Sequence, residues 1–420
     1  MAANPRHQTS GPSAPGRRRA PCALLWGVVA AGLGIRGWLW WTTEGHQFDM
    51  FAFRATGQIA RTDLANLYSR ANAGPTQWPY LPGMLPWLAL SDLVAGEAVQ
   101  LFARLAKLPL IAADLALAAA AGWWWVRRGG RRLVWLPPAL ILLGPMYFFE
   151  SGFHVQFDQV ATCLGLLGVM GWLRRLDGWP VPALVCGLLL GVGASVKTMP
   201  ILLLAAILPS ARSIREGAML VAGALLPVLP AAAYLVVDRS AFLDAMSYHG
   251  VVGFGGLSML VQPDLLRQNF LHEPVALNAV SDVLQSLSTS LTLASTALVA
   301  LLVRRGALAP DLAAVAVLTG ISTVGVNFSP LYTVWLPPFL ILAGRLRTAV
   351  LATLIAAVPV IVYNLPHVTG SLTWPRWSVY WLYAPGMAAV FALGAAIYLS
   401  IMVPAVRSVL QPRDARLVTV

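Results

Sequence analysis

The sequence predicts an all-α membrane protein, a polytopic bundle of about twelve transmembrane helices. Of its 420 residues, 58% are hydrophobic and 11% are charged, and the mean hydropathy is +0.70. Apolar runs recur with lengths near the roughly 20 residues that cross about 30 Å of hydrocarbon. In lipid such runs must be helices, because a helix satisfies its own backbone hydrogen bonds. Charged gaps separate twelve of these runs: 22–41, 98–126, 133–149, 158–173, 180–195, 199–209, 217–237, 283–303, 308–326, 331–344, 348–365 and 379–404.

We attribute the positive net charge of the chain to its membrane topology. The net charge of +12 is almost wholly arginine, since Lys107 and Lys197 are the only lysines. Arginine clusters occupy alternate gaps, which the positive-inside rule places in the cytoplasm. No nucleic-acid partner is therefore expected. We expect a disordered basic cytoplasmic N-terminus at 1–21, a transmembrane domain at 22–404 and a cytoplasmic tail at 405–420.

The N-terminal apolar run has two interpretations. A cleaved signal peptide is one, but the run 22–41 is long and has no clear small-x-small cleavage site before its aromatic end. We interpret it as an uncleaved first span. The cysteines Cys22, Cys163 and Cys186 lie in or beside apolar runs and offer no disulfide framework or CxxC metal pair, so they are expected to be core thiols.

The remaining gaps would lie outside the cytoplasm, and they concentrate histidines and acids. They include two large loops, 42–97 and 238–282, and they hold five of the six histidines: His46, His154, His249, His272 and His367. This concentration favours chemistry on the outer face. Exclusion of arginine during topogenesis would by itself enrich the same loops in other polar residues.

The first loop predicts two helices lying at the membrane surface. Apolar residues at three- to four-residue spacing indicate an amphipathic helix over 48–61. Residues 82–95 are apolar but too short to span, which favours a second interfacial or re-entrant helix. The short runs 180–195 and 199–209 are expected to form a tilted pair that meets at the outer face.

Several polar motifs occur in order between residues 45 and 340. They are the acid-bearing first loop with Trp78-Pro-Tyr80-Leu-Pro82, His154-Val-Gln156-Phe-Asp158, Val196-Lys197-Thr-Met-Pro200, and Phe328-Ser-Pro330-Leu-Tyr332-Thr-Val-Trp335-Leu-Pro-Pro338. Together they resemble the GT-C superfamily, polytopic glycosyltransferases that take sugar from a polyprenyl phosphate, and the likeness is greatest to mannosyltransferase-like members and the GPI mannosyltransferase type. The Tyr-Pro-Pro and Ser-Pro-Gln-Tyr patterns of the family stand here as Tyr-Leu-Pro and Ser-Pro-Leu-Tyr.

The resemblance implies a function. It implies transfer of a hexose, with mannose as the first expectation, from a polyprenyl-phosphate sugar to a lipid-linked, glycan or protein hydroxyl. Transfer would invert the anomeric configuration at the extracytoplasmic face of a bacterial plasma membrane. The alternative is a secondary transporter or flippase for a lipid-linked or anionic solute. No cofactor and no metal are expected, because the outer face carries no DxD or HxxxH pattern.

Asp49 is the candidate catalytic residue. By position, the resemblance implies that it is the general base, and desolvation by Phe48 and Phe51 would raise its pKa into a useful range. The alternative role is a carboxylate that stabilises the start of the helix at 48–61. His46 and Arg54 are further candidates in the same segment.

Lys197 is the candidate for the donor phosphate. It stands at a predicted helix start, where an ammonium beside free backbone N–H groups suits an anion. A lysine that only reaches to the lipid headgroups would look the same in sequence, and the resemblance favours phosphate.

His154, Gln156 and Asp158 are expected at the outer mouth of the fourth span. The i, i+4 spacing places His154 and Asp158 on one helical face, where they could pair with each other or contact sugar hydroxyls. Second-rank candidates for donor binding are Tyr80, Tyr332, His272 and Arg376.

Arg36 and Asp114 stand out as charges inside two apolar runs. Each lies about 7 to 9 Å below the outer end of its span at 1.5 Å per residue. Lone intramembrane charges are functional suspects, but two opposite charges at one depth favour a structural pair.

Overall fold

The computed structural model describes residues 19–74, 78–248, 255–271, 277–368 and 376–411. Within these ranges the secondary structure is helical, without strands. In this described part of the chain, six helices are long and apolar enough to cross a membrane, or seven if the bent pair 214–225 and 229–237 is one span. The chain is therefore a helical membrane protein. That all twelve apolar runs cross the membrane stays a prediction.

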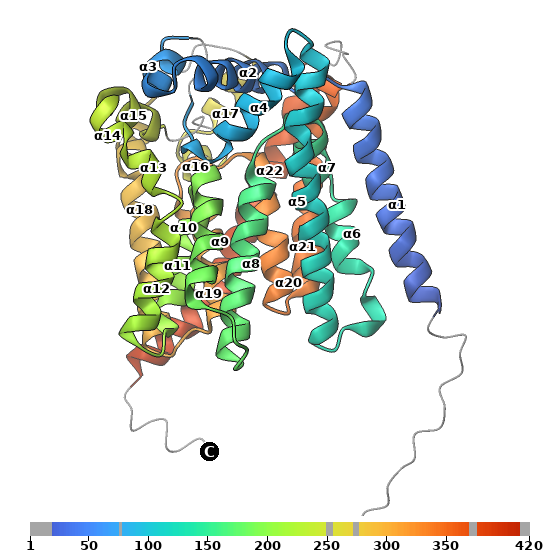
Figure 1. Cartoon of the computed structure of the whole chain (residues 1–420). Coiled ribbons are helices and arrows are strands. Elements are labelled where there is room, and N and C mark those ends of the chain that lie inside the picture. Colours follow the sequence, from blue (N-terminus) through green and yellow to red (C-terminus); the bar gives the residue numbers. More distant parts are fainter. Residues whose placement is uncertain (1–18, 75–77, 249–254, 272–276, 369–375, 412–420) are drawn as a thin grey trace, which may run out of the picture.

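The six long spans run along the bundle (Figure 1). Five are single helices: α1 (Arg19–Thr42), α5 (Val99–Arg127), α18 (Ala279–Arg304), α21 (Leu346–Val368) and α22 (Arg376–Leu410). The remaining span, residues 131–154, is the third in chain order and is interrupted. It consists of η4 (Arg131–Leu133), α6 (Leu136–Leu142), α7 (Pro145–Phe149) and the π turn η5 (Glu150–His154). Gly144 and Pro145 mark the interruption, since proline has no N–H to continue the hydrogen-bond ladder.

The other apolar runs are also helical but shorter. They form α8 (Asp158–Leu176), α9 (Ala183–Val196), α10 (Met199–Leu202), α11 (Leu204–Ile207), η6 (Leu208–Ser210), α12 (Ile214–Leu225), α13 (Leu229–Ala232), α14 (Tyr234–Val237), α19 (Pro310–Val324), η7 (Pro330–Trp335) and α20 (Leu336–Leu342). Helices α10, α13, α19 and α20 carry proline at the first or second position, where its fixed φ suits a helix start.

Glycine sets the close packing of α9 against α12. A Cβ on Gly187 would overlap the carbonyl oxygen of Leu220, and one on Gly223 would overlap that of Leu184. Small residues let helix backbones approach in lipid, where association depends on van der Waals contact. This pair holds the end of α9, and with it Lys197, in a fixed place.

Short helices lie across one end of the bundle (Figure 1). They are α2 (Gln47–Thr62), η2 (Leu64–Asn66), α3 (Leu67–Asn72), η3 (Pro82–Met84), α4 (Leu85–Ala95), α15 (Arg239–Met246), α16 (Leu257–Val261) and α17 (Asp264–Leu271). The sequence analysis expected helices at 48–61 and 82–95, and α2 and α4 occupy these positions. Helix α2 buries Met50, Phe53 and Gly57 against the bundle.

A polar contact joins α2 to α4. Asp92 is 2% exposed, and its carboxylate lies 3.3 Å from the guanidinium of Arg61 and 3.8 Å from that of Arg54. Arg54 also donates to the Gly96 carbonyl at 2.6 Å. A Cβ on Gly57 would lie 2.8 Å from the Leu88 carbonyl oxygen, so the two helices touch backbone to backbone there.

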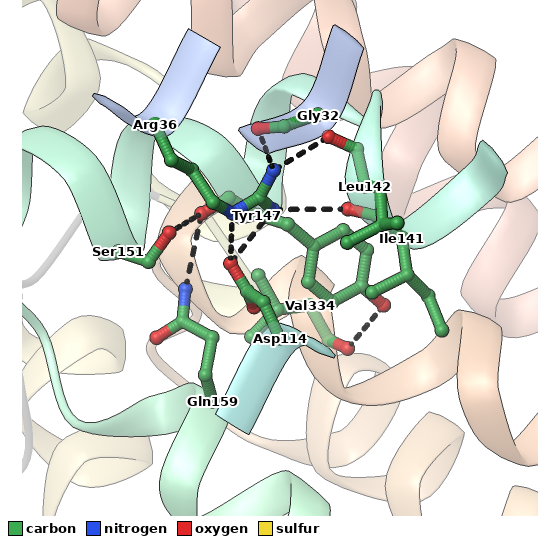
Figure 2. Close-up of polar contacts among 9 residues, drawn as sticks. All are labelled: Gly32, Arg36, Asp114, Ile141, Leu142, Tyr147, Ser151, Gln159 and Val334. Atoms are coloured by element: carbon green, nitrogen blue, oxygen red, sulfur yellow. Dashed lines mark hydrogen bonds and ion pairs between the residues drawn. The ribbon is translucent and has the colours of Figure 1, made fainter. Parts of the chain in front are cut away.

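Arg36 and Asp114 form an ion pair inside the bundle (Figure 2). The side chains are 1% and 0% exposed, and Arg36 donates to Asp114 Oδ2 from Nε at 2.9 Å and from Nη2 at 2.7 Å. Arg36 also donates to the carbonyls of Leu142 at 2.6 Å and Ile141 at 3.3 Å. These are end carbonyls of α6, and Pro145 has no N–H to give to the Ile141 oxygen. The Arg36–Asp114 ion pair therefore stabilises the interruption between α6 and α7.

Tyr147 carries the same network on to η7. Its hydroxyl donates to the Val334 carbonyl at 2.8 Å, and its own carbonyl accepts from the Ser151 hydroxyl at 2.9 Å (Figure 2). The Gln159 amide donates to that carbonyl at 3.4 Å. The segments on either side of the π turn are thus tied to one buried tyrosine.

We expect Arg36→Ala and Asp114→Ala each to destabilise the protein by about 3–5 kcal/mol, because each leaves an uncompensated buried charge. The double variant should cost less than the sum of the two single variants, since it leaves neither charge behind. Unfolding of the three purified variants in one detergent measures the coupling. Strictly additive losses would show that the two side chains do not depend on each other.

Candidate active site

The candidate site begins at a strained turn between η5 and α8. Val155 has a φ of 65°, a conformation that β-branched residues rarely adopt. Val155 is fully buried, and its N–H donates to the Glu150 carbonyl at 2.7 Å. The turn separates His154 from Gln156, and both side chains reach Asp49. Backbone strain of this kind gathers at functional sites, where the surrounding structure holds it.

Asp49 lies in the first turn of α2 at the centre of a hydrogen-bonded network. Its Oδ2 is 2.9 Å from Nδ1 of His154 and 3.2 Å from Nδ1 of His46. Its Oδ1 accepts from the Gln156 amide at 3.0 Å. The side-chain oxygen of Gln156, Oε1, accepts in turn from the Tyr80 hydroxyl at 3.0 Å. Residues from both ends of the first loop and from the broken span therefore meet at one carboxylate.

The two histidines are fixed by stacking and by the backbone. The rings of His46 and His154 stack with centroids 4.5 Å apart, and the ring of Tyr363 stacks on the other side of His154 at 5.5 Å. The His46 N–H donates to the Phe153 carbonyl at 3.0 Å. Gly45 precedes it at a φ of 95°, in the left-handed region that glycine adopts without strain.

The pKa of Asp49 is lowered, whereas the sequence analysis expected it to be raised. Burial of the carboxyl favours the neutral form and raises its pKa, but the hydrogen bonds from His154 and His46, together with their charges, outweigh burial. Phe48 and Phe51 are 58% and 59% exposed and do not enclose the carboxyl as expected. Asp49 is therefore a hydrogen-bonded carboxylate, ionised at neutral pH.

A cavity of about 540 Å³ lies in front of this network. Its lining combines aromatic rings with amide, imidazole, hydroxyl and carboxylate groups. The side chains or backbone that line it belong to His46, Phe48, Asp49, Ala52, Phe53, Asn72, Gly74, Pro79, Tyr80, His154, Gln156, Tyr248, Asn327, Phe328, Ser329, Leu331, Tyr332 and Tyr363. Burial raises the pKa of Tyr80, so its hydroxyl stays protonated and donates to Gln156.

A second charged cluster surrounds Asp158. Its Oδ2 lies 2.5 Å from Nζ of Lys197, and its Oδ1 accepts from the Trp335 indole N–H at 2.6 Å. The Lys197 ammonium also lies 4.4 Å from the centroid of the Tyr332 ring, which stacks on Trp335. His154 and Asp158 do not pair with each other, which was one of the two roles left open for them: His154 contacts Asp49, and Asp158 contacts Lys197.

A smaller cavity of about 270 Å³ adjoins the first and takes in Lys197. The hydroxyl-bearing residues Thr198, Ser288 and Thr292 also line it. The two cavities share Pro79, Tyr80, Tyr248, Asn327 and Tyr332. Tyr80 and Tyr332 therefore stand between the Asp49 network and the Lys197 ammonium.

The structure adds two residues that the sequence analysis did not single out. Glu150 is fully buried in the π turn, and neither carboxylate oxygen has a hydrogen-bond partner within the part of the chain that the structure describes. An acid at the end of an apolar run was its only signal. Tyr363 reaches the cavity from α21, and nothing in its apolar sequence context marked it.

Three of the candidate residues are not seen in the site. Arg54 contacts α4 and does not line either cavity. His272 and the side chain of Arg376 lie outside the described residues. Their assignment to donor binding stays a prediction.

No protein-family profile, curated protein or solved structure matches the chain. The likeness of its short motifs to the GT-C superfamily therefore stays an expectation.

We expect Asp49→Asn to lower the thermal stability near pH 7, with a difference that shrinks as the pH falls below about 4. The folded-state pKa of Asp49 lies below its unfolded value of about 3.9, so its ionised form stabilises the fold above that value and loses this effect as the pH falls. Thermal unfolding of both proteins between pH 3 and 7 measures the difference. Asp63→Asn, in an exposed part of the same loop, is the control. An equal difference at every pH would contradict this account of the Asp49 carboxylate.

Proposed function

We propose that the chain is an integral membrane glycosyltransferase. It transfers a hexose, with mannose as the first candidate, from a polyprenyl-phosphate sugar to a hydroxyl of a lipid-linked, glycan or protein acceptor. The reaction inverts the anomeric configuration. The site faces the extracytoplasmic side of a bacterial plasma membrane, and both termini are cytoplasmic.

The observation that carries this proposal is an ionised carboxylate on the wall of one cavity and a lysine in the adjoining one. Asp49 lines the cavity of 540 Å³ and Lys197 lines that of 270 Å³. Transfer of a sugar needs a group that accepts the acceptor's proton and a group that stabilises the leaving phosphate. Tyr80 and Tyr332 line both cavities, so the proposed base Asp49 and the proposed phosphate-binding Lys197 lie in neighbouring cavities.

The composition of the larger cavity suits a hexose. A pyranose has C–H faces that pack on aromatic rings and a rim of hydroxyls that needs hydrogen-bonding groups. Tyr80, Phe328 and Tyr363 supply rings, and Gln156 and Asn327 supply amides. Burial of polar hydroxyls is favourable only where such partners are available.

Asp49 takes the proton of the acceptor hydroxyl as that oxygen attacks the anomeric carbon. The carboxylate is ionised and is oriented by Gln156 and His154. Its lowered pKa makes it a weak base in the ground state, so proton transfer accompanies formation of the new glycosidic bond. Orientation by neighbouring hydrogen bonds offsets part of that weakness.

Lys197 stabilises the departing lipid phosphate. An ammonium has three donors, and Asp158 is its one hydrogen-bond partner among the described residues. Asp158 and the Tyr332 ring hold the ammonium beside the smaller cavity. The hydroxyl of Thr198 lies in the same lining. A monophosphate leaving group needs less compensating charge than a diphosphate.

A transporter or flippase is the second candidate function, and Glu150 favours it. Unpaired buried acids within membrane spans commonly mark ion or proton pathways. Glu150 is buried without a hydrogen-bond partner among the described residues and belongs to a candidate span. This reading requires solute movement across the bilayer rather than sugar transfer.

We expect Asp49→Asn to reduce sugar transfer by roughly 10²- to 10⁴-fold, the range for loss of a general base. Expression and donor-lipid binding should stay close to wild type. The assay uses protein in nanodiscs with radiolabelled polyprenyl-phosphomannose or polyprenyl-phosphoglucose and a native membrane lipid extract. Asp63→Asn should transfer at the wild-type rate. Wild-type turnover by Asp49→Asn would end the mechanism, and solute movement without any transfer would favour the transporter.

The role of Lys197 is tested with the double variant Asp158→Asn/Lys197→Met. It removes the ammonium without leaving a buried lone carboxylate. We expect weaker donor binding as well as slower transfer, because the ammonium meets the phosphate in the ground state and in the transition state. Donor affinity at the wild-type level would remove Lys197 from the phosphate site.

A further inference from the structure

Three groups that commonly bind metals converge at the edge of the larger cavity. In the part of the chain that the structure describes, one group of three such residues is close enough to hold an ion: His46, Asp49 and His154, with ligand atoms all within 4.8 Å of one another. They come from residues 46–49 and from residue 154, which no local sequence pattern links.

We propose that His46, Asp49 and His154 form a binding site for a divalent transition-metal ion. Two imidazole nitrogens and one carboxylate oxygen would hold the ion, and its remaining positions would face the cavity. The inference goes beyond sugar transfer and does not depend on it, because any chemistry in this cavity would meet the same three ligands.

The distances among the three ligands fit one ion. Metal–ligand bonds to imidazole nitrogen and carboxylate oxygen are about 2.0–2.2 Å long, so two ligands of one tetrahedral ion lie about 3.4 Å apart. The Nδ1 atoms of His154 and His46 lie 2.9 and 3.2 Å from Asp49 Oδ2. These two ligand pairs therefore need to separate by a few tenths of an ångström, and the two imidazole nitrogens lie within 4.8 Å of each other.

The ring planes must also rotate toward a common point. The imidazoles of His46 and His154 stack with 18° between their planes, whereas a coordinated ion lies near the plane of each ring. His154 is held between His46 and Tyr363 and is 1% exposed. His46 is 17% exposed, so the adjustment falls to its ring, which is the less enclosed of the two.

Neighbouring groups already orient the carboxylate. Gln156 donates to Asp49 Oδ1 at 3.0 Å and accepts from Tyr80, so Oδ2 is the oxygen that faces the imidazoles. Hydrogen bonds to the far side of a ligand are typical of metal sites, where they fix its direction and tune its affinity. The same bonds keep Asp49 ionised, which a cation requires.

The donor set selects the class of metal. Two imidazoles with one carboxylate suit Zn²⁺, Co²⁺ and neighbouring transition metals, whereas Mg²⁺ and Ca²⁺ prefer oxygen ligands. Three protein ligands leave at least one position open, as in catalytic rather than structural sites. That position faces a cavity of 540 Å³ and would accept an oxygen from a hydroxyl or a phosphate.

Occupancy would change the part that Asp49 plays. An ion on Oδ2 takes the electron pair that would otherwise accept a proton, so the ion and the proton compete for one oxygen. A hydroxyl bound at the open position would have its pKa lowered by the ion. The inference differs from the expectation of no metal, which rested on the absence of sequence patterns.

The test is direct binding of metal to the full-length protein in nanodiscs. Metal-stripped protein is titrated with Co²⁺, whose visible absorption reports coordination number, and zinc content is measured after equilibration with Zn²⁺ and gel filtration. We expect one ion per chain. Asp49→Asn and His46→Gln should each weaken binding by at least about 10- to 100-fold, the loss seen when groups supporting a metal ligand are changed.

Asp63→Asn is the control, since Asp63 is a half-buried acid of the same loop that lines neither cavity. It should bind as the wild type does. His46→Gln keeps the Asp49–His154 contact and so remains informative if Asp49→Asn fails to fold. No stoichiometric binding by the wild type, or equal binding by the wild type and both variants, would overturn the proposal. Failure of sugar transfer with intact metal binding would leave this site standing and would count only against the proposed function.

Discussion

The interruption between α6 and α7, within the span of residues 131–154, is the constraint that sets the geometry of the rest of the structure. Gly144 and Pro145 end α6 early and leave carbonyls without donors at a buried position. Arg36 fills that gap while Asp114 balances its charge. The chain then continues through a π turn to Val155, whose left-handed backbone reverses the direction of the following side chains. In an unbroken helix, His154 and Asp158 would lie on one face and would belong to the same cluster of side chains.

Two clusters result, and their charges differ. Around Asp49, one carboxylate is hydrogen-bonded by neutral or titratable groups, which leaves an anionic oxygen at a cavity wall. Around Asp158, the carboxylate is paired with Lys197, so that cluster has no net charge before a ligand arrives. We propose the first environment for the acceptor hydroxyl and the second for the donor phosphate. Tyr80 belongs to the lining of both cavities and so couples them.

The sequence alone predicted the parts of the fold that depend on the length of the apolar runs and on the spacing of apolar residues within them. Each apolar run is helical, and α2 and α4 occur where an amphipathic run and a short apolar run predicted them. Arg36 and Asp114 could be paired because helix rise converts sequence position into depth. The inner and outer faces of α2 could not be told apart, since the bundle buries Met50 and Phe53 and leaves Phe48 and Phe51 exposed.

The site itself was predictable only in its parts. Asp49, His154 and Lys197 were identifiable as polar residues in apolar surroundings, but their partners depend on the turn at Val155. No local rule predicts a left-handed valine, so a helical face was the natural expectation there. Tyr363 and Glu150 belong to apolar runs and gave little signal. The pKa of Asp49 is lowered rather than raised because the hydrogen bonds and charges of His154 and His46 outweigh burial of the carboxyl.

The central claim is that the adjoining cavities hold the sugar and the phosphate of one lipid-linked donor. A cryo-electron microscopy structure in nanodiscs with polyprenyl-phosphomannose bound tests it most directly. The account predicts phosphate density within hydrogen-bond reach of the Lys197 ammonium, with the sugar beside Tyr80 and its anomeric carbon facing the Asp49 cavity. Donor density away from both cavities, or a solute path that runs past Glu150 to the opposite end of the bundle, would contradict it.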